Sequence, residues 1–110
     1  MDKNYIMKRL MELPGEINAA EMGVIDEQKV LDTAKIALAD KESALTLSGE
    51  INGKNAEQRA AQLREATKKE RAAVAVAEFD VHVIKARLNL LHHEFKAMRS
   101  IATILSGEAV

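Results

Sequence analysis

The chain has 110 residues, of which 47% are hydrophobic, 30% are charged and only 3% are aromatic, and its formal net charge is −1. It contains no cysteine, which excludes disulfides, thiol catalysis and cysteine-based zinc sites. The N-terminal stretch has no apolar core of signal-peptide length, and no apolar run reaches the roughly 18 residues of a membrane span. From these absences we expect a cytoplasmic protein. Because alanine makes up much of the apolar fraction, we expect an all-α fold in which closely packed helices form a single domain over residues 1–110.

The N-terminal segment predicts a short helix over about residues 3–13, with Met7, Leu10 and Met11 on one face. We expect this face to dock on the chain's own hairpin, and docking on a partner is the alternative. Pro14-Gly15 follows and predicts a break, because proline is tolerated in the first turn of a helix and not deep inside one. Beyond the break, a long helix is predicted over about residues 16–48. A series of apolar residues at seven-residue spacing supports it: Leu10, Ile17, Val24, Leu31, Leu38 and Leu45.

The stretch that follows has the chemistry of a corner between two helices. Ser48-Gly49 ends the long helix, since glycine readily takes the left-handed conformation of a helix C-terminus. Asn52-Gly53 is a turn dipeptide. Asn55 and Gln58 have the spacing of a capping box at the start of the next helix. The corner is therefore predicted over residues 49–55.

The second half carries a heptad seam, which predicts one continuous helix over about residues 56–106. Only Thr67 and Glu70 are plainly polar among its positions. Valines between residues 74 and 83 also hint at strand alternation, but the seam stays in register on both sides of them. The seam consists of Ala56, Ala60, Leu63, Thr67, Glu70, Val74, Ala77, Val81, Ile84, Leu88, Leu91, Phe95, Met98, Ala102 and Leu105.

Folding about residue 52 gives a long antiparallel helical hairpin of coiled-coil type, in which residue i lies near residue 104 − i. Further apolar residues lie outside the two stripes that this pairing buries. They predict self-association into a helical bundle, as a homo-oligomeric dimer or tetramer. The candidate self-association or partner face consists of Met7, Leu10, Met11, Val76, Val83, Leu90 and Ile101.

Catalytic and metal-binding patterns are missing from the sequence. Glu78 and His82 have i, i+4 spacing, but no second such pair faces them, and His92 and His93 are adjacent. We therefore expect neither an enzyme nor a cofactor or metal site, and we interpret the histidines as residues on the surface or flanking the seam.

A basic stripe near the corner is a candidate nucleic-acid contact; it comprises Lys54, Arg64, Lys68 and Arg71. Three glutamates lie in the same turns, and no aromatic residue is present there for base stacking. A solvated, ion-paired helix face is the favoured interpretation, and nucleic-acid binding is the alternative.

The corner and the turns after it, "INGKNAEQRAAQLREAT" at residues 51–67, resemble short helical-hairpin proteins of bacteriophages and prophages. The genes of those phage proteins tend to lie in early regions with recombination and replication functions. The resemblance implies a small non-catalytic accessory factor that modulates DNA-processing machinery through a protein or nucleic-acid partner. Taken with the heptads, it leads us to expect a protein-interaction factor; the alternatives are a nucleic-acid-binding protein and a structural spacer or scaffold.

Overall fold

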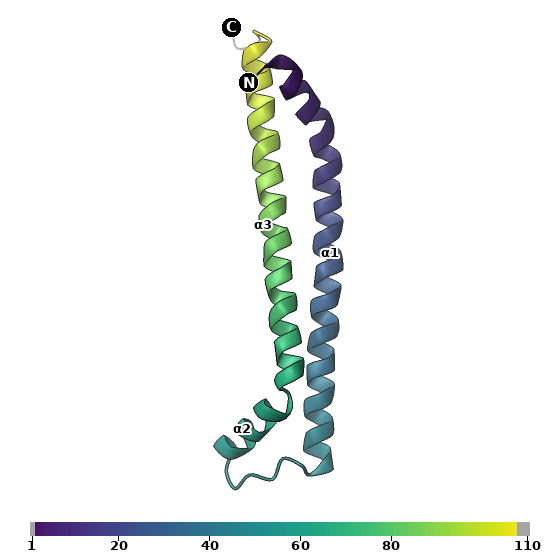
Figure 1. Cartoon of the computed structure of the whole chain (residues 1–110), viewed down its shortest axis with the longest axis vertical. Helices are drawn as coiled ribbons and strands as arrows, with labels where there is room; N and C mark the ends of the chain where they lie inside the picture. Colours follow the sequence, from purple (N-terminus) through teal and green to yellow (C-terminus); the bar gives the residue numbers. More distant parts are fainter. Residues whose placement is uncertain (1, 108–110) are drawn as a thin grey trace. The chain divides into compact units, whose positions relative to one another are not determined.

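The computed structural model describes residues 2–107, and these form an all-α helical hairpin, as the heptads predicted (Figure 1). Helix α1 spans Lys3–Ser48, α2 spans Ala56–Ala66 and α3 spans Lys68–Leu105. Contacts divide the chain into two compact units, and α1 and α3 run through both. The first unit consists of the part of α1 up to Asp26 and the part of α3 from His82 onward. The second unit is Glu27–Val81. The prediction of a single domain stays a prediction.

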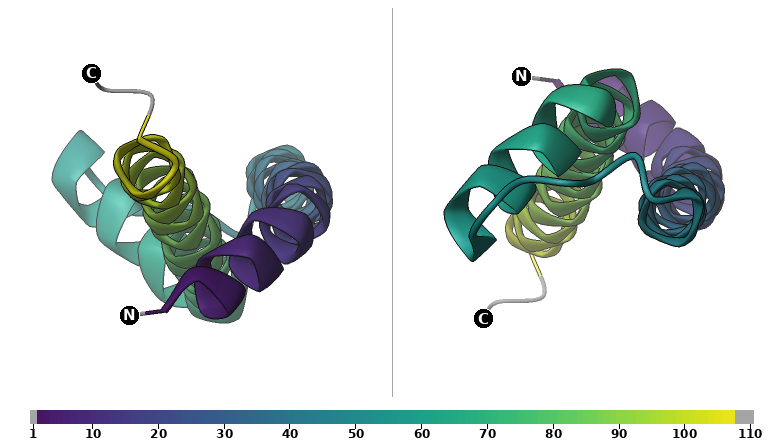
Figure 2. Two further views of the ribbon diagram at one scale, coloured as in Figure 1. Left: turned by 90° about the horizontal axis from the view of Figure 1, so that it is seen from above. Right: turned by 90° about the horizontal axis from the view of Figure 1, so that it is seen from below.

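The predicted break at Pro14-Gly15 is wrong, because α1 is one helix of 46 residues with Pro14 inside it. Proline in a helix interior costs about 3 kcal/mol. Continuing the helix brings Ile6, Leu13 and Ile17 onto one buried face, and burying each such side chain stabilises by about 1.5–3 kcal/mol. Packing therefore outweighs the local penalty. The first turns of α1 are bent towards the end of α3 instead, as Figure 1 and the left view of Figure 2 show.

The core of the first unit lies between these bent turns and the C-terminal half of α3. Its buried residues are Ile6, Leu13, Ile17 and Ala20 of α1 and Leu91 and Met98 of α3. Leu10 and Ile101, both predicted for a partner face, are half-buried and pack against this core. Leu10 thus docks on the chain's own hairpin, which was the favoured expectation for its helix, whereas the assignment of Ile101 to a partner face is wrong, because Ile101 lies beside the same cluster.

The second unit has a smaller core, in which Leu31 of α1 packs with Ala77 and Val81, and Val74 lies against them. The predicted register placed Leu31 near Ala73, so the observed partners lie about one helical turn further along α3. The register is set by this apolar cluster and not by the corner, because α2 separates the corner from α3.

A break at Thr67 divides the predicted helix over 56–106 into α2 and α3, so that prediction is wrong. Thr67 has φ −111° and ψ 19°, and it is fully buried. Its hydroxyl donates to the carbonyl oxygen of Leu63 at 2.7 Å and accepts from Arg71 Nε at 3.0 Å. Such bonds to the carbonyl four residues earlier often bend helices, and Thr67 differs in its burial from Thr46 and Thr103, which make the same bond inside α1 and α3. In Figure 2, α2 is accordingly seen from the side where α3 is seen nearly end-on.

The corner forms where it was predicted, between Ser48 and Ala56. Gly49 has φ +79°, the left-handed conformation that ends α1. Asn55 caps α2, and its side-chain oxygen accepts from the backbone N–H of Gln58 at 2.8 Å. Gln62 Oε1 accepts from the backbone N–H groups of Asn52 and Gly53, at 3.1 and 2.7 Å. These bonds satisfy the corner's backbone locally.

Candidate interaction surfaces

Helix α3 carries a second apolar stripe on the side opposite its packed seam. We call it the outer stripe; it consists of Ala72, Val76, Phe79, Val83, Ala86 and Leu90, whose spacing alternates between four and three residues. Its four large side chains are exposed: Val76 by 62%, Phe79 by 67%, Val83 by 51% and Leu90 by 68%. At about 100° per residue, the stripe is centred roughly 160° around the helix from the seam positions Ala77 and Val81.

A helix with apolar residues on two opposite faces is typical of a helix that is covered on both sides. Within each unit only one of these faces is covered: the seam packs on α1, and the members of the outer stripe stay exposed. Large exposed apolar surfaces of this kind mark protein interaction sites. The outer stripe is therefore a candidate interaction surface.

Charged residues flank the outer stripe on one side. Asp80 is half-buried and Arg87 is exposed, and neither forms an ion pair within residues 2–107. His82 and Asn89, both exposed, lie on the other flank. The flanks thus offer unlike charges one heptad apart, which is the arrangement that fixes partner and orientation in helix pairs.

Most of the predicted partner face is exposed as expected. Val76, Val83 and Leu90 lie in the outer stripe, and Met7 and Met11 are exposed by 56% and 80% on α1. Leu10 and Ile101 are half-buried and pack against the core of the first unit. Sequence reasoning missed Phe79 and the two alanines, although the seven-residue spacing of Val76, Val83 and Leu90, with Phe79 three residues after the first, was a sufficient signal.

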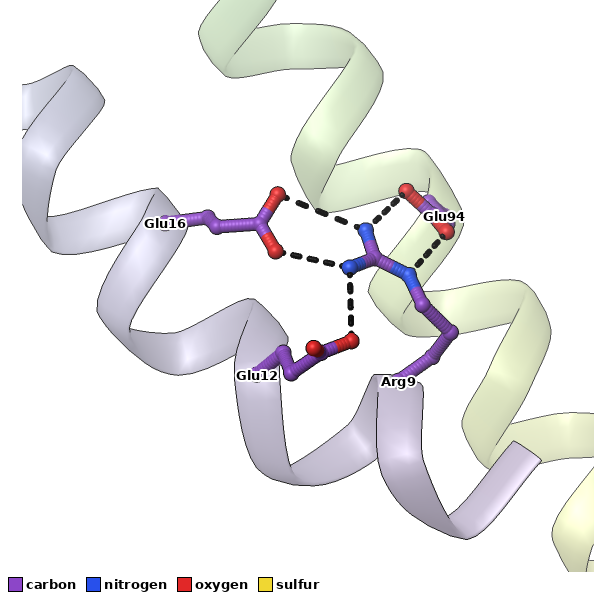
Figure 3. A network of polar contacts seen from close by, with 4 residues as sticks. All are labelled: Arg9, Glu12, Glu16 and Glu94. Carbon is purple, nitrogen blue, oxygen red and sulfur yellow. Dashed lines mark hydrogen bonds and ion pairs between the residues drawn. The ribbon is translucent and has the colours of Figure 1, made fainter. Parts of the chain in front are cut away.

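A polar cluster of Arg9, Glu12, Glu16 and Glu94, which we call the clamp, holds the first turns of α1 against α3 (Figure 3). Arg9 Nε and Nη2 both donate to the Glu94 carboxylate at 2.8 Å, and Nη1 donates to Glu16 at 2.7 Å and to Glu12 at 3.2 Å. Hydrogen bonds from the guanidinium hold the pKa of the Glu94 and Glu16 carboxyls below their usual range, and the carboxylates raise the pKa of Arg9. Because these bonds occupy all three of its nitrogens, Arg9 has a structural role.

The sequence predicted that Arg64, Lys68 and Arg71 share one helical face, but Thr67 separates Arg64 in α2 from Lys68 and Arg71 in α3, and Lys54 lies in the corner. Lys68 Nζ lies 3.8 Å from Glu65 Oε1, and both side chains are largely exposed. Arg71 Nη2 lies 3.9 Å from Glu42 Oε2. Two of the four cations are thus next to carboxylates, which lowers the positive charge available for a phosphate backbone.

No group of three or more His, Asp or Glu residues among residues 2–107 is placed to hold a metal ion. His82, His92 and His93 are all exposed. None of the helices in the described part of the chain is long and apolar enough to cross a membrane.

No protein-family model, curated protein or solved structure matches the chain. The proposals below therefore start from the outer stripe and from the resemblance at residues 51–67.

Proposed function

We propose that the protein is a non-catalytic helical interaction factor that binds an apolar helix along the outer stripe of α3. The observation that carries the proposal is the exposure of four large apolar side chains, by 51% to 68%, on the face of α3 opposite its packed seam. The stripe continues over five turns at heptad spacing, which matches the way one helix packs against another.

The size of the stripe supports a helix as its ligand. Complete burial of a Val, Leu or Phe side chain is worth about 1.5–3 kcal/mol, so covering the exposed parts of these four gains roughly 4–7 kcal/mol. Association costs an estimated 4–15 kcal/mol in lost freedom. A ligand must therefore add apolar surface of its own and complement the flanking charges, and an amphipathic helix does both.

The biological setting is a separate part of the proposal and rests on the resemblance at residues 51–67. It assigns the protein to phage-encoded accessory factors that modulate DNA-processing machinery in the cytoplasm. The lack of cysteine agrees with a reducing compartment. The basic stripe gives no comparable support to direct nucleic-acid binding, because Lys68 and Arg71 lie beside carboxylates.

The test is an affinity capture in which the tagged chain is mixed with an untagged copy and a bacterial lysate, and captured proteins are identified by mass spectrometry. We compare the wild type with Leu90→Glu on the outer stripe. The matched control is Ile36→Glu, which changes a side chain of α1 that is 62% exposed. Circular dichroism confirms that both variants stay helical.

We expect the wild type and Ile36→Glu to capture the same proteins, and Leu90→Glu to lose at least one of them. A captured set that is the same for all three would refute binding through the outer stripe.

A further inference from the structure

We propose that the helix covering the outer stripe belongs to a second copy of this chain, which lies antiparallel to the first along the same stripe. This inference rests on the proposed function and names its partner. A symmetric pair uses the same surface twice, so each copy supplies the apolar helix that the other requires.

The spacing of the stripe restricts the register of the pair to steps of one heptad, and the flanking charges select one of them. Val76, Val83 and Leu90 occupy one of the two core positions of a heptad, and Ala72, Phe79 and Ala86 occupy the other. In an antiparallel pair, residues of the first kind face residues of the second. A two-fold axis between positions 83 and 86 then places Phe79 opposite Leu90 of the second copy. Val83 lies opposite Ala86, so two layers of smaller side chains lie at the centre of the contact and a Phe–Leu layer lies on either side of them.

The flanking charges agree with the same register. Asp80 comes to lie beside Arg87 of the second copy, and symmetry repeats this ion pair at the other end of the contact. His82 faces Asn89 on the other flank, so no like charges meet there. Asp80 and Arg87 form no ion pair within residues 2–107, and this arrangement supplies a partner for both.

A parallel pair of the same helices lacks this complementarity. It sets Asp80 beside Ala75 and Arg87 beside His82, and it stacks Phe79 on its own copy. Charge pairing at the flanks of a helix pair sets the orientation, and here only the antiparallel order brings opposite charges together. The antiparallel arrangement is therefore the one that the outer stripe and its flanks specify.

Disulfide trapping tests the register directly, because the chain has no cysteine of its own. The proposed register places Val76 opposite His93 of the second copy, and both residues are exposed. We mix Val76→Cys with a size-tagged His93→Cys in a glutathione redox buffer and separate the products on a non-reducing gel. The control pair is Ala37→Cys, an exposed position of α1, with the same His93→Cys.

We expect the mixed 76–93 disulfide to exceed both the 76–76 product and the control product at least tenfold. In the antiparallel pair the two copies of residue 76 lie roughly 25 Å apart. A disulfide requires Cα atoms within about 7 Å. A dominant 76–76 product would indicate a parallel pair and overturn the proposal, as would a mixed product no more abundant than the control.

Light scattering after size exclusion gives an independent result. We expect a dimer for the wild type and for Ile36→Glu, and a dimer dissociation constant at least tenfold higher for Leu90→Glu. A monomeric wild type at all concentrations overturns the second copy as the partner.

The affinity capture distinguishes failure of the self-pairing proposal from failure of the proposed function. Loss of the untagged chain from the Leu90→Glu capture supports both proposals. Loss of other proteins alone refutes the second copy and leaves the proposed function standing, and no loss at all refutes both.

Discussion

Leu13 offers a sharp test of the claim that packing holds α1 together across Pro14. Its side chain is completely buried, among Ile6, Ile17 and Ala20 in the core of the first unit. Leu13→Ala removes three carbon atoms and leaves a cavity. The lost transfer energy is about 2.4 kcal/mol at 0.8 kcal/mol per methylene, and the cavity raises the total to roughly 3–4 kcal/mol, within the range measured for buried leucines.

Leu90→Ala is the matched control, since it makes the same chemical change at a side chain that is 68% exposed. In dilute solution, where chains are separate, we expect it to cost no more than about 0.5 kcal/mol. Chains of this size have total stabilities of about 5–15 kcal/mol. Leu13→Ala should therefore lower the melting temperature by about 12 °C or more, and Leu90→Ala by about 2 °C.

The assay is urea unfolding followed by circular dichroism at low protein concentration, with equal slopes required of all three proteins before free energies are compared. A loss below about 1 kcal/mol for Leu13→Ala would refute the reasoning, and so would equal losses for the two variants. Either result would mean that burial in this core is not what keeps α1 helical through Pro14.

Three further predictions concern the clamp, the helix glycines and the basic stripe. The pKa values of Glu94 and Glu16 are lower in the folded state than in the unfolded chain. The clamp therefore stabilises the folded state fully above the unfolded pKa of about 4.3. This stability is lost as the pH falls through the folded pKa values. Urea unfolding over a pH series should therefore show a shallower acid loss for Arg9→Gln than for the wild type; parallel curves would contradict the role of the clamp. Gly15→Ala should stabilise α1 by about 0.5–1 kcal/mol, because no atom lies within 4 Å of the added methyl group. Gly23→Ala should stabilise it less, because its Cβ would lie 3.1 Å from the Ile84 side chain. Thermal melts of the two variants compare these gains, and a larger gain at Gly23 would be the contrary result. Changing Arg64, Lys68 and Arg71 of the basic stripe together to alanine should leave the elution of the chain with a short single-stranded oligonucleotide unchanged at low salt; salt-sensitive wild-type binding that this variant loses would instead establish a nucleic-acid site.

Only part of the candidate surface could be predicted from the sequence. The heptad spacing of Val76, Val83 and Leu90 identifies one face of a helix by local geometry alone, and these residues are indeed exposed. The same pattern gives no means of choosing which of two apolar faces packs inward. Ile101 was therefore assigned to a partner face, although contacts with distant residues bury part of it.

Local chemistry in the sequence was enough to predict the helical class, the corner and the part of the seam in α3 up to Met98, because periodicity and capping depend on neighbours a few residues away. The seam prediction is wrong for α2, where no residue is buried. Leu31 of the first apolar series and Leu91 of the seam are buried as predicted, and Asn55 caps α2. The tertiary structure decided what happens where a local signal competes with packing. Pro14 signals a break, but the burial of Leu13 offsets its cost and the helix continues. Thr67 signals only a polar residue in a seam, yet the continuous helix ends there, where Thr67 is buried and its hydroxyl bonds to Leu63 and Arg71. Both outcomes depend on burial energies that a pattern of residue types does not contain.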